Sequence, residues 1–392
     1  MKRKITSEFV GFGHPDKVAD QISDAILDEY LKRDPNTRAG IEVMIKDNIV
    51  VLGGEVNSKA AIDYDSTVRK VISNIPYSEE HNLSANNIKI INLIGKQSPE
   101  ISNGIEKEDG IVGAGDQGFT VGFASNETED YLPLGVYVAK KICKYIEKQT
   151  KKGLGPDCKS QVIMEYEDNG KARIDSILVS SMHKGCLETD RLQIISMIEN
   201  NEIGLSNNIF EKYIKKGNFL IKVNPCGEWR IGGSISDCGM TGRKIVVDQY
   251  GGYAPVGGGS ISGKCMSKID RSAAYLCRYI AKNIVAAGLS DNAKVELSYI
   301  IGEPQPSSIN IEMNTNKELE EEITKWIVSH IDLSPSGIIK RFDGSYPRYY
   351  YTARNGHFGI SNNEIENENI KKIYPWEVTD LAEILKLSIK NN

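Results

Sequence analysis

The 392-residue sequence lacks the marks of a secreted, membrane-spanning or zinc-binding chain. No stretch reaches the roughly 18 apolar residues of a transmembrane helix, and the first residues contain no apolar run of signal-peptide length. The seven cysteines are odd in number, lie far apart and form no C-x-x-C pair, so disulfides and a structural zinc site are not expected. We therefore expect a cytoplasmic protein with reduced thiols.

A dominant charge of one sign is also missing. Lys and Arg number 48 and Asp and Glu number 53, which gives a formal net charge of -5. This balance supplies no overall positive field, so nucleic acid and membrane surfaces are not expected partners. An anionic ligand must be held by a local cluster of basic side chains.

What the sequence does contain is a recurring pattern, in which a loop rich in Gly and Asp runs into a segment with helical periodicity. Helices are expected after Pro15, from near Pro133, and from Arg271 to a stop signal at Gly288. Strand-like runs lie between them at 41–56, 160–181, 243–248 and 307–315. The pattern predicts an α/β protein (α+β mixed sheets) in which sheets backed by helices recur about three times.

The first expected helix carries two stripes. Its apolar residues form one stripe: Val18, Ile22, Ala25, Ile26 and Leu27. Asp20, Asp24 and Asp28 recur at i, i+4 on the other side of the helix. The third expected helix turns Ala274, Cys277, Ile280, Ala281 and Ile284 inward.

Residues 258–265 nearly match the phosphate-binding P-loop G-x-x-x-x-G-K-[ST], but Cys265 stands where Ser or Thr would hold magnesium. A P-loop also needs a strand that ends at the first glycine and a helix that begins at the lysine. Here the segment QYGGYAP intervenes between the strand-like run and the glycines, and the segment CMSKIDRS delays the helix. A P-loop kinase or GTPase is therefore the least favoured function.

Several short segments pair basic side chains with carboxylates. Lys264 and Lys268 can direct two ammonium groups to one polyanion, and Asp270 offers an oxygen ligand for magnesium, although a solvated charged turn is the competing interpretation. Comparable pairs are His14 with Asp16, Asp157 with Lys159, and Arg243 with Lys244. Because no hydrolase motif such as G-x-S-x-G or H-E-x-x-H occurs, the pairs predict a reaction on a polyphosphate that depends on positioning and charge stabilisation.

The chain resembles the S-adenosylmethionine synthetase (methionine adenosyltransferase) family in five segments that occur in matching order. They are GHPDKVADQISDAILD, GAGDQG, FASNETEDYLPL, DCGMTGRKIVVDQYGGYAPVGGGSISGK and SKIDRSAAYLCRYIAKNIVAAGL. The resemblance implies three similar domains in a pseudo-threefold arrangement: an N-terminal domain at 1–100, a central domain at 111–228 and a C-terminal domain at 229–392. A mobile gating loop and linker would occupy 96–118.

The activity implied by the resemblance is the synthesis of S-adenosyl-L-methionine. The methionine sulfur would attack C5′ of ATP, and the bound triphosphate would then be hydrolysed to diphosphate and phosphate. Two Mg²⁺ ions per site and one K⁺ ion would be cofactors. The protein would be a homodimer with active sites at the interface, or a tetramer of paired dimers.

The resemblance also implies site residues, by motif. ATP would be bound by His14, Asp157, Lys159, Trp229, Asp237, Arg243, Lys244, Ser260 and Lys264. Methionine would be bound by Glu55, Gln97, Asp116, Asp237 and Lys268. The catalytic set would be His14, Lys159, Arg243, Lys264 and Lys268, with Asp16 and Asp270 as magnesium ligands and Glu42 as the potassium ligand.

Some positions depart from the family pattern. Phe12 replaces a usual Glu, Cys265-Met266 replace Asp-Pro, and Glu228 and Arg230 flank Trp229 so that a positive charge moves by two positions. Two alternatives therefore remain beside the main hypothesis. One is a low-activity homologue that acts as a regulatory subunit, and the other is a synthetase with an altered thioether preference.

Overall fold

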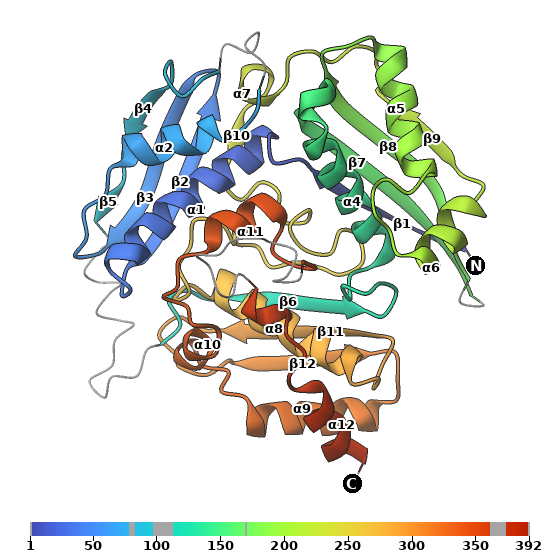
Figure 1. The fold of residues 1–392 in the computed structure, drawn as a ribbon. Helices are drawn as coiled ribbons and strands as arrows, with labels where there is room; N and C mark the ends of the chain where they lie inside the picture. The colour runs from blue at the N-terminus through green and yellow to red at the C-terminus, as the bar shows by residue number, and fades with distance from the viewer. Residues whose placement is uncertain (1, 78–82, 97–112, 169–170, 361–373, 391–392) are drawn as a thin grey trace.

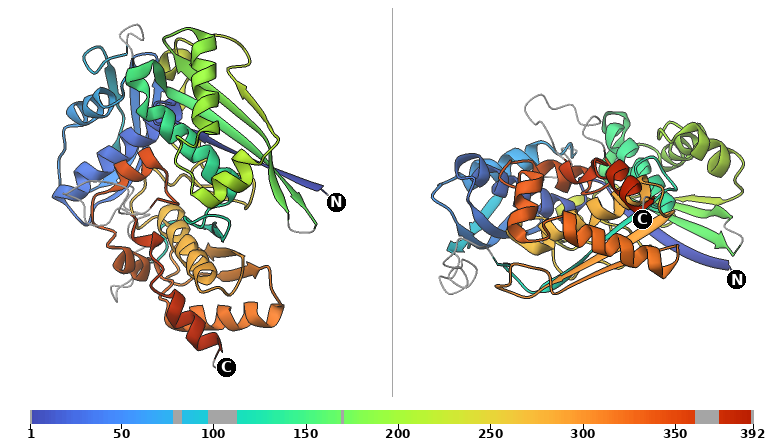
Figure 2. Two further views of the ribbon diagram at one scale, coloured as in Figure 1. Left: turned by 45° about the vertical axis from the view of Figure 1, so that its right-hand side comes forward. Right: turned by 90° about the horizontal axis from the view of Figure 1, so that it is seen from below.

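The computed structural model describes residues 2–77, 83–96, 113–168, 171–360 and 374–390. In this part of the chain the strands form three sheets, and a long helix packs on each of them (Figure 1). The three helices α1, α4 and α8 lie toward the middle of the molecule, with the sheets around them (Figure 2). The predicted α/β class and its threefold recurrence are confirmed.

The first sheet has the order β10-β2-β3-β4, with β5 also paired to β3. Its strands are β2 (Arg38–Lys46), β3 (Ile49–Asn57), β4 (Lys89–Asn92), β5 (Gly95–Lys96) and β10 (Gly239–Met240). Helices α1 (Pro15–Arg33) and α2 (Tyr64–Ser73) accompany it, and α1 packs on β2. The predicted hairpin is confirmed, because β2 and β3 pair antiparallel across Asp47, whose φ of 52° suits a tight turn.

The second sheet has the order β1-β7-β8-β9. Its strands are β1 (Lys2–Val10), β7 (Leu154–Glu167), β8 (Ala172–His183) and β9 (Leu220–Val223). Helix α4 (Leu134–Lys148) packs on β1 and β7, and α5 (Leu187–Glu199) on β9. Shorter helical segments are η2 (Thr150–Lys152), α6 (Asn207–Ile209), η3 (Phe210–Lys215) and α7 (Gly233–Ser236). The predicted antiparallel pairing of β7 with β8 is confirmed, while its expected turn at 169–170 lies outside the described residues.

The third sheet has the order β12-β11-β6. Its strands are β6 (Gly118–Ser125), β11 (Asn292–Tyr299) and β12 (Ser308–Met313). The helices of this layer are α8 (Ile269–Ala286), α9 (Lys317–His330), α10 (Pro335–Phe342), α11 (Tyr349–Asn355), η5 (Pro375–Glu377) and α12 (Ala382–Lys390). The predicted inward residues of α8 are all buried, and Gly288 follows the helix with a φ of 70°.

Each sheet takes one strand from a distant part of the chain. β1 pairs with β7, β6 pairs with β11, and β10 pairs with β2. The connecting segments therefore cross between layers at the middle of the molecule. This crossing brings the sequence motifs of three separate regions toward one another.

The expected strand at 243–248 is wrong. Residues 241–250 form consecutive turns, and Asp248 N donates to the carbonyl of Lys244 at 2.8 Å. The β-branched residues of this run suggested a strand, but the amide of Gly242, one residue before it, is taken by a side chain of α1. A strand needs a partner for its backbone groups, and this segment finds its partners locally.

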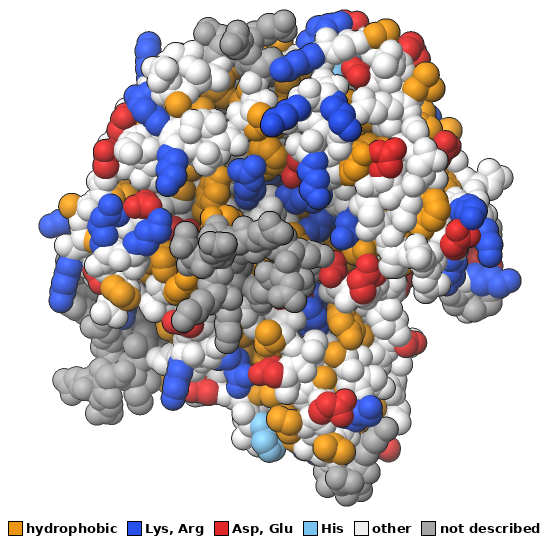
Figure 3. Space-filling view, in the orientation of Figure 1, with side chains coloured by type: hydrophobic (Ala, Val, Ile, Leu, Met, Phe, Trp, Pro, Cys, Tyr) orange, Lys and Arg blue, Asp and Glu red, His pale blue; other side chains and the backbone are white. Residues whose placement is uncertain are grey.

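Side chains of both charge signs are interspersed on the face shown in Figure 3, and basic ones are more frequent in its upper half. Among the described helices none combines the length and apolar content needed to cross a bilayer.

Candidate active site

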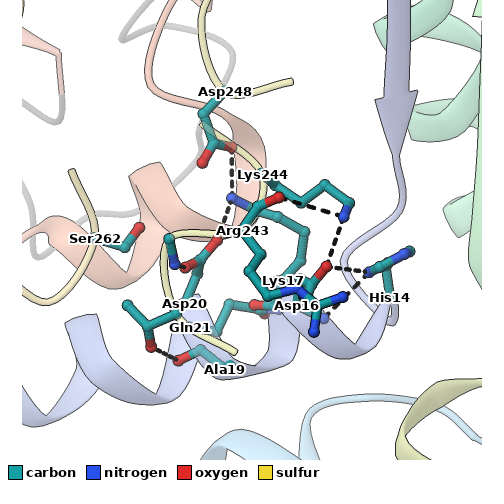
Figure 4. A network of polar contacts seen from close by, with 12 residues as sticks. His14, Asp16, Lys17, Ala19, Asp20, Gln21, Arg243, Lys244, Asp248 and Ser262 are labelled. Carbon is teal, nitrogen blue, oxygen red and sulfur yellow. Dashed lines mark hydrogen bonds and ion pairs between the residues drawn. The ribbon is translucent and has the colours of Figure 1, made fainter. Parts of the chain in front are cut away.

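The N-terminus of α1 is built around His14. This residue is the N-cap, and its Nδ1 accepts a hydrogen bond from the amide of Asp16 at 3.1 Å. Pro15 occupies the first helical turn, as predicted. The other ring nitrogen of His14 points away from the network drawn in Figure 4. Because Nδ1 accepts, a neutral ring carries its proton on Nε2 and can donate it to a ligand.

The electrostatic environment keeps His14 neutral. Burial is the largest cause, and the nearby cations Lys244 and Lys159 add to it, so the pKa of His14 falls to about 2. An imidazole with this pKa is no general base or acid near neutral pH. It can serve as a fixed hydrogen-bond donor at the site.

The row of aspartates on α1 is buried rather than solvated, which the sequence pattern did not reveal. Each carboxylate accepts backbone amides from a distant segment. Asp20 accepts from Gly242 at 2.9 Å, and Asp24 accepts from Gly263 at 2.8 Å. Asp28 accepts from Tyr349 and Tyr350, both at 2.9 Å. We call Asp16, Asp20, Asp24 and Asp28 the acidic row.

The acidic row fixes the two loops that carry the predicted phosphate ligands. Gly242 directly precedes Arg243 and Lys244, and Gly263 directly precedes Lys264. A backbone amide bonded to a buried carboxylate leaves little freedom for the next residue, because the charge-assisted bond is strong and shielded from water. Helix α1 therefore sets the position of both loops.

Lys17 completes the buried part of this network. Its Nζ lies 2.6 Å from Asp248 Oδ1 and 3.1 Å from Asp20 Oδ2 (Figure 4). The sequence placed Lys17 in the GHPDK motif but assigned it no role. With its charge matched by two carboxylates inside the protein, Lys17 ties the 241–250 turns to α1.

Asp16 is surrounded by basic groups. Its Oδ2 lies 2.5 Å from Lys244 Nζ, and its Oδ1 lies 3.4 Å from Arg243 Nε. Oδ1 also accepts the amide of Met240 at 2.9 Å. The structure thus brings together a predicted magnesium ligand and two predicted triphosphate ligands.

Asp157, Lys159 and Asp237 border the same place. The buried Asp157 accepts the amide of Gly233 at 2.7 Å through Oδ2, whereas its buried Oδ1 has no hydrogen-bond partner among the described residues. Burial raises the pKa of Asp157 to about 7, although the Gly233 amide and Lys159 lower it. Lys159 is exposed in β7, next to the strand position of Val10. Asp237 is exposed and interacts electrostatically with His14.

Trp229 lies half-buried on the loop that follows β9. Its indole Nε1 donates to the carbonyl of Ile231 at 3.0 Å, and its backbone pairs with His183 at the end of β8. The loop continues through Gly232, whose Cβ position would lie 2.9 Å from Asp157 Oδ2. The loop that carries Trp229 therefore passes beside Asp157.

A second group forms around the glycine-rich loop. Lys264 Nζ lies 2.5 Å from Asp270 Oδ2, and Lys264 also makes an isolated β-bridge with Gly40. A Cβ on Gly40 would lie 3.8 Å from Glu55 Oε1, so this predicted methionine ligand borders the loop. Helix α8 begins at Ile269, five residues beyond Lys264, which rules out the helix position that a P-loop requires.

The remaining predicted residues of this group lie near the start of α8. Lys268 is the N-cap, and Asp116 is exposed in the segment that leads into β6. A Cβ on Gly118 would lie 4.0 Å from the Ile269 side chain, which brings that segment to the helix start. Ser260 borders the residues around His14, because a Cβ added to Gly242 would lie 2.5 Å from the Cβ of Ser260.

Glu42 and Gln97 stand apart from these contacts. Glu42 is exposed in β2, opposite Gly53 of β3. Gln97 and the expected gating loop up to residue 112 lie outside the described residues. We call the residues around the start of α1 the His14 group: His14, Asp16, Asp157, Lys159, Arg243 and Lys244. In the described part of the chain, no hydrogen bond or ion pair joins the His14 group to the Lys264–Asp270 group.

The departures from the family pattern are explained by packing. Phe12 is buried with its ring 4.2 Å from the guanidinium carbon of Arg354. Cys265 and Met266 are also buried, and Cys265 Sγ accepts the amide of Ala39 at 3.3 Å. Arg230 donates to the carbonyl of Lys184 at 2.9 Å, away from the phosphate ligands. These side chains therefore support the fold around the site.

The chain is similar to known proteins over nearly its whole length. Residues 2–99, 111–229 and 231–369 match the N-terminal, central and C-terminal domains of S-adenosylmethionine synthetase. The S-adenosylmethionine synthases of Mycoplasma capricolum and Mycoplasma mycoides are each 42% identical over 391 residues, covering 98% of this chain and 97% of the relative. The solved structure of an unusual S-adenosylmethionine synthetase from Campylobacter jejuni has a TM-score of 0.85 at 34% identity, covering 98% of this chain and 99% of that one.

Proposed function

We propose a residue-level mechanism for this chain, which belongs to the S-adenosylmethionine synthetase family and makes S-adenosylmethionine from ATP and methionine. It is a methionine adenosyltransferase. In the proposed reaction the methionine sulfur forms a bond to C5′ of ATP while the bond from C5′ to the phosphate oxygen breaks. The triphosphate leaves intact and is then hydrolysed to diphosphate and phosphate.

One observation carries the mechanism: a neutral histidine donor is surrounded by cations. His14 directs Nε2 away from the network, and Lys244 and Lys159 both contribute to the low pKa of its ring. This arrangement suits a reaction in which negative charge develops on a leaving oxygen. A fixed donor and fixed cations stabilise that charge without rearranging during the step.

We assign the leaving group to the basic side chains of both groups. Lys159, Arg243 and Lys244 would hold the triphosphate from the His14 side, and Lys264 would hold it from the glycine-rich loop, with Ser260 between them. The acidic row supports this assignment because it fixes the residue before Arg243 and the residue before Lys264. The nucleophile belongs to the substrate, which agrees with the absence of a hydrolase motif.

The nucleoside would lie between Trp229 and Asp157. The indole offers a face for stacking on adenine. The buried Oδ1 of Asp157 is an acceptor without a hydrogen-bond partner in the described chain, so a nucleoside hydroxyl is a fitting ligand. Asp237, close to His14, would border both substrates.

Methionine would be bound by the residues around the second group. Glu55, Asp116 and Lys268 offer opposite charges for an amino acid's ammonium and carboxylate. Glu55 borders the loop of Lys264, and Asp116 and Lys268 lie toward the start of α8. Gln97 and the gating loop complete the proposal.

The donor set fits magnesium. Members of this family generally need a divalent metal. No cluster of three or more metal-binding side chains occurs among the described residues, but magnesium is commonly held by one or two carboxylates together with substrate phosphates. Asp16 and Asp270 each lie beside a predicted phosphate-binding lysine, so they are the residues that would hold two Mg²⁺ ions. When bound, Mg²⁺ would offset charge on the triphosphate oxygens.

Potassium is proposed at Glu42. Its carboxylate is exposed on β2 and supplies the hard oxygen donor that an alkali cation takes. A single carboxylate leaves the rest of the coordination shell to backbone, water or a second chain.

The cytoplasmic location of the protein also stays a prediction.

A homodimer is proposed from an exposed apolar row on the first sheet. Met240, Met44, Val51 and Ile91 follow one another across β10, β2, β3 and β4 by strand register. Met240, Met44 and Ile91 are exposed, while α1 covers the opposite face of the sheet. Such a row in contact with water indicates a protein partner. A second copy would also bring one chain's His14 group to the other chain's Lys264–Asp270 group; a tetramer of two such dimers is the larger assembly.

Product analysis tests the proposed chemistry. Purified protein would be incubated with ATP, methionine, Mg²⁺ and K⁺, and S-adenosylmethionine, diphosphate and phosphate measured together by mass spectrometry. Equal amounts of the three are expected. Formation of ADP and phosphate with the C5′ carbon unchanged would contradict the mechanism. The regulatory-subunit and altered-thioether hypotheses are not favoured, given the 42% identity to named synthases.

A further inference from the structure

The loop that carries Trp229 is attached to β8 through one histidine. The amide of His183 donates to the carbonyl of Trp229 at 3.0 Å, and the amide of Trp229 donates to His183 Nε2 at 3.2 Å. His183 therefore bonds both backbone groups of the same residue, one with its main chain and one with its side chain. The position of Trp229 depends on the orientation of this imidazole.

The contact with the Trp229 amide decides the protonation of His183. A backbone amide can only donate, so Nε2 must be the unprotonated nitrogen and the proton lies on Nδ1. Nδ1 is 3.0 Å from Asp190 Oδ2 on helix α5. Both atoms are buried and neither makes a hydrogen bond in the described chain, so the contact between them is electrostatic and lacks hydrogen-bond alignment. The carboxylate of Asp190 therefore favours the one tautomer that can accept from Trp229.

The surroundings leave little freedom for this pair. The carboxylate of Asp190 lies under Gly185, where a Cβ would lie 3.2 Å from Oδ2. On the outer side, Arg230 donates to the carbonyl of Lys184 at 2.9 Å and its Nε lies 3.0 Å from Glu228 Oε2. Burying an imidazole and a carboxylate costs free energy that apolar residues would not cost. A pair that is retained at this cost is expected to have a role at the site.

We propose that His183 and Asp190 are positioning residues for the adenine end of ATP. They hold the backbone of Trp229 so that its indole is in place before the nucleotide binds, and a preorganised surface loses less entropy on binding. The inference rests on the proposed stacking of Trp229 on adenine. It assigns a binding role to two residues that touch neither substrate.

Kinetics of paired variants test the proposal. His183→Phe removes the acceptor for the Trp229 amide, whereas His183→Gln retains an acceptor near the position of Nε2. We expect the KM for ATP to rise about five- to tenfold in His183→Phe, the range that a lost hydrogen bond gives. The KM for methionine and kcat should stay within about twofold, and His183→Gln should restore most of the loss. Asp190→Asn should give an intermediate rise.

A matched control comes from the same sheet. Glu165 is a buried carboxylate that pairs with Arg173 at 3.1 Å, near the turn end of the β7–β8 hairpin. Glu165→Gln removes one buried charge without touching the Trp229 loop. It should leave the KM for ATP unchanged. An equal rise in this variant would show that general loosening of the sheet is responsible, and would overturn the proposal.

A double-mutant cycle separates positioning from stability. In a Trp229→Ala background, His183→Phe should no longer raise the KM for ATP, because the group that it positions is gone. An effect of the same size in both backgrounds would reject the positioning role. If Trp229→Ala itself leaves the KM for ATP unchanged, the stacking assignment is wrong instead. If His183→Phe does not fold, Asp190→Asn is measured in the same cycle, and an equal rise of the KM for ATP in both backgrounds would reject the role.

Discussion

Lys264 Nζ lies 2.5 Å from Asp270 Oδ2, so a predicted triphosphate ligand and a predicted magnesium ligand neutralise each other. The same relationship recurs between Lys244 and Asp16 on the other side of the site. In both places, binding of a metal–triphosphate complex would replace the lysine–aspartate pair by two new pairs, lysine with triphosphate and aspartate with the metal. The residues proposed to bind the metal–triphosphate complex are thus already paired in the protein alone.

Lys264→Ala should lower kcat by at least tenfold, and a loss of about 100-fold is typical when one preorganised charge is removed. Initial rates of S-adenosylmethionine formation measure the effect. The fold should remain intact, because the side chain is only partly buried and surface ion pairs contribute little to stability. Lys294→Ala is the matched control, since Lys294 pairs with Glu312 at 2.7 Å in the third sheet, away from the loop. Normal turnover in Lys264→Ala would contradict its role.

His14→Asn should lower kcat by about 100-fold or more, because Asn retains the N-cap acceptor but not the Nε2 donor. Single-turnover rates would locate the defect in the chemical step. An unchanged kcat in His14→Asn would contradict the role of the imidazole as a hydrogen-bond donor.

The same variant should alter how stability depends on pH. His14 has a folded pKa of about 2 against an ordinary value of 6.5, so its contribution is present above pH 6.5 and is lost as pH falls below it. At pH 5 the free energy of unfolding of the parent should be lower than that of His14→Asn by about 2 kcal/mol, relative to their difference at pH 7.5. Urea unfolding at the two pH values measures this. Parallel pH profiles would show that His14 titrates normally.

Asp157→Asn should stabilise the protein at high pH and weaken ATP binding. The folded pKa of Asp157 is raised to about 7, so stability that is present below its unfolded pKa is lost as pH rises toward and through 7. At pH 8 the variant should unfold with a free energy higher by about 2–4 kcal/mol, and at pH 4 the difference should vanish. Denaturant titrations measure both values. The KM for ATP should rise, and in the parent it should rise as pH falls below about 7.

Mixing two inactive variants should restore activity if the site is shared between copies. Lys244→Ala damages the His14 group and Lys264→Ala damages the second group. A mixed dimer contains one site with both groups intact and one site with neither. Co-expressed chains should therefore recover up to about a quarter of parent activity when the chains pair at random, whereas each variant alone stays inactive. Absence of recovery in a verified mixed dimer would place both groups of one site in one chain.

Local patterns in the sequence were sufficient for the regular elements near the site. Alternation and Asp47 predicted the β2–β3 hairpin, and helical periodicity with Gly288 predicted α8. The run at 243–248 misled because β-branched composition does not reveal whether a partner strand exists.

The role of the acidic row could not be read from the chain. The amides that Asp20 and Asp28 accept belong to Gly242, Tyr349 and Tyr350, more than 200 positions away. Likewise, no pattern joins His183 to Trp229, because their pairing arises only when the loop after β9 folds back along β8. The family motifs nevertheless assigned His14, Asp16 and Lys244 to one site, and these three side chains lie beside one another.

Helix α1 positions several segments that are synthesised at very different times, because they lie far apart in the sequence. The carboxylates of α1 accept hydrogen bonds from the backbone amides of residues 240, 263 and 349. A growing chain therefore cannot satisfy all of these carboxylates until most of the chain has been synthesised. A truncation that removes Tyr349 would leave the buried carboxylate of Asp28 without this amide donor. The groups that each chain contributes to the proposed site are therefore in place only when its fold is complete.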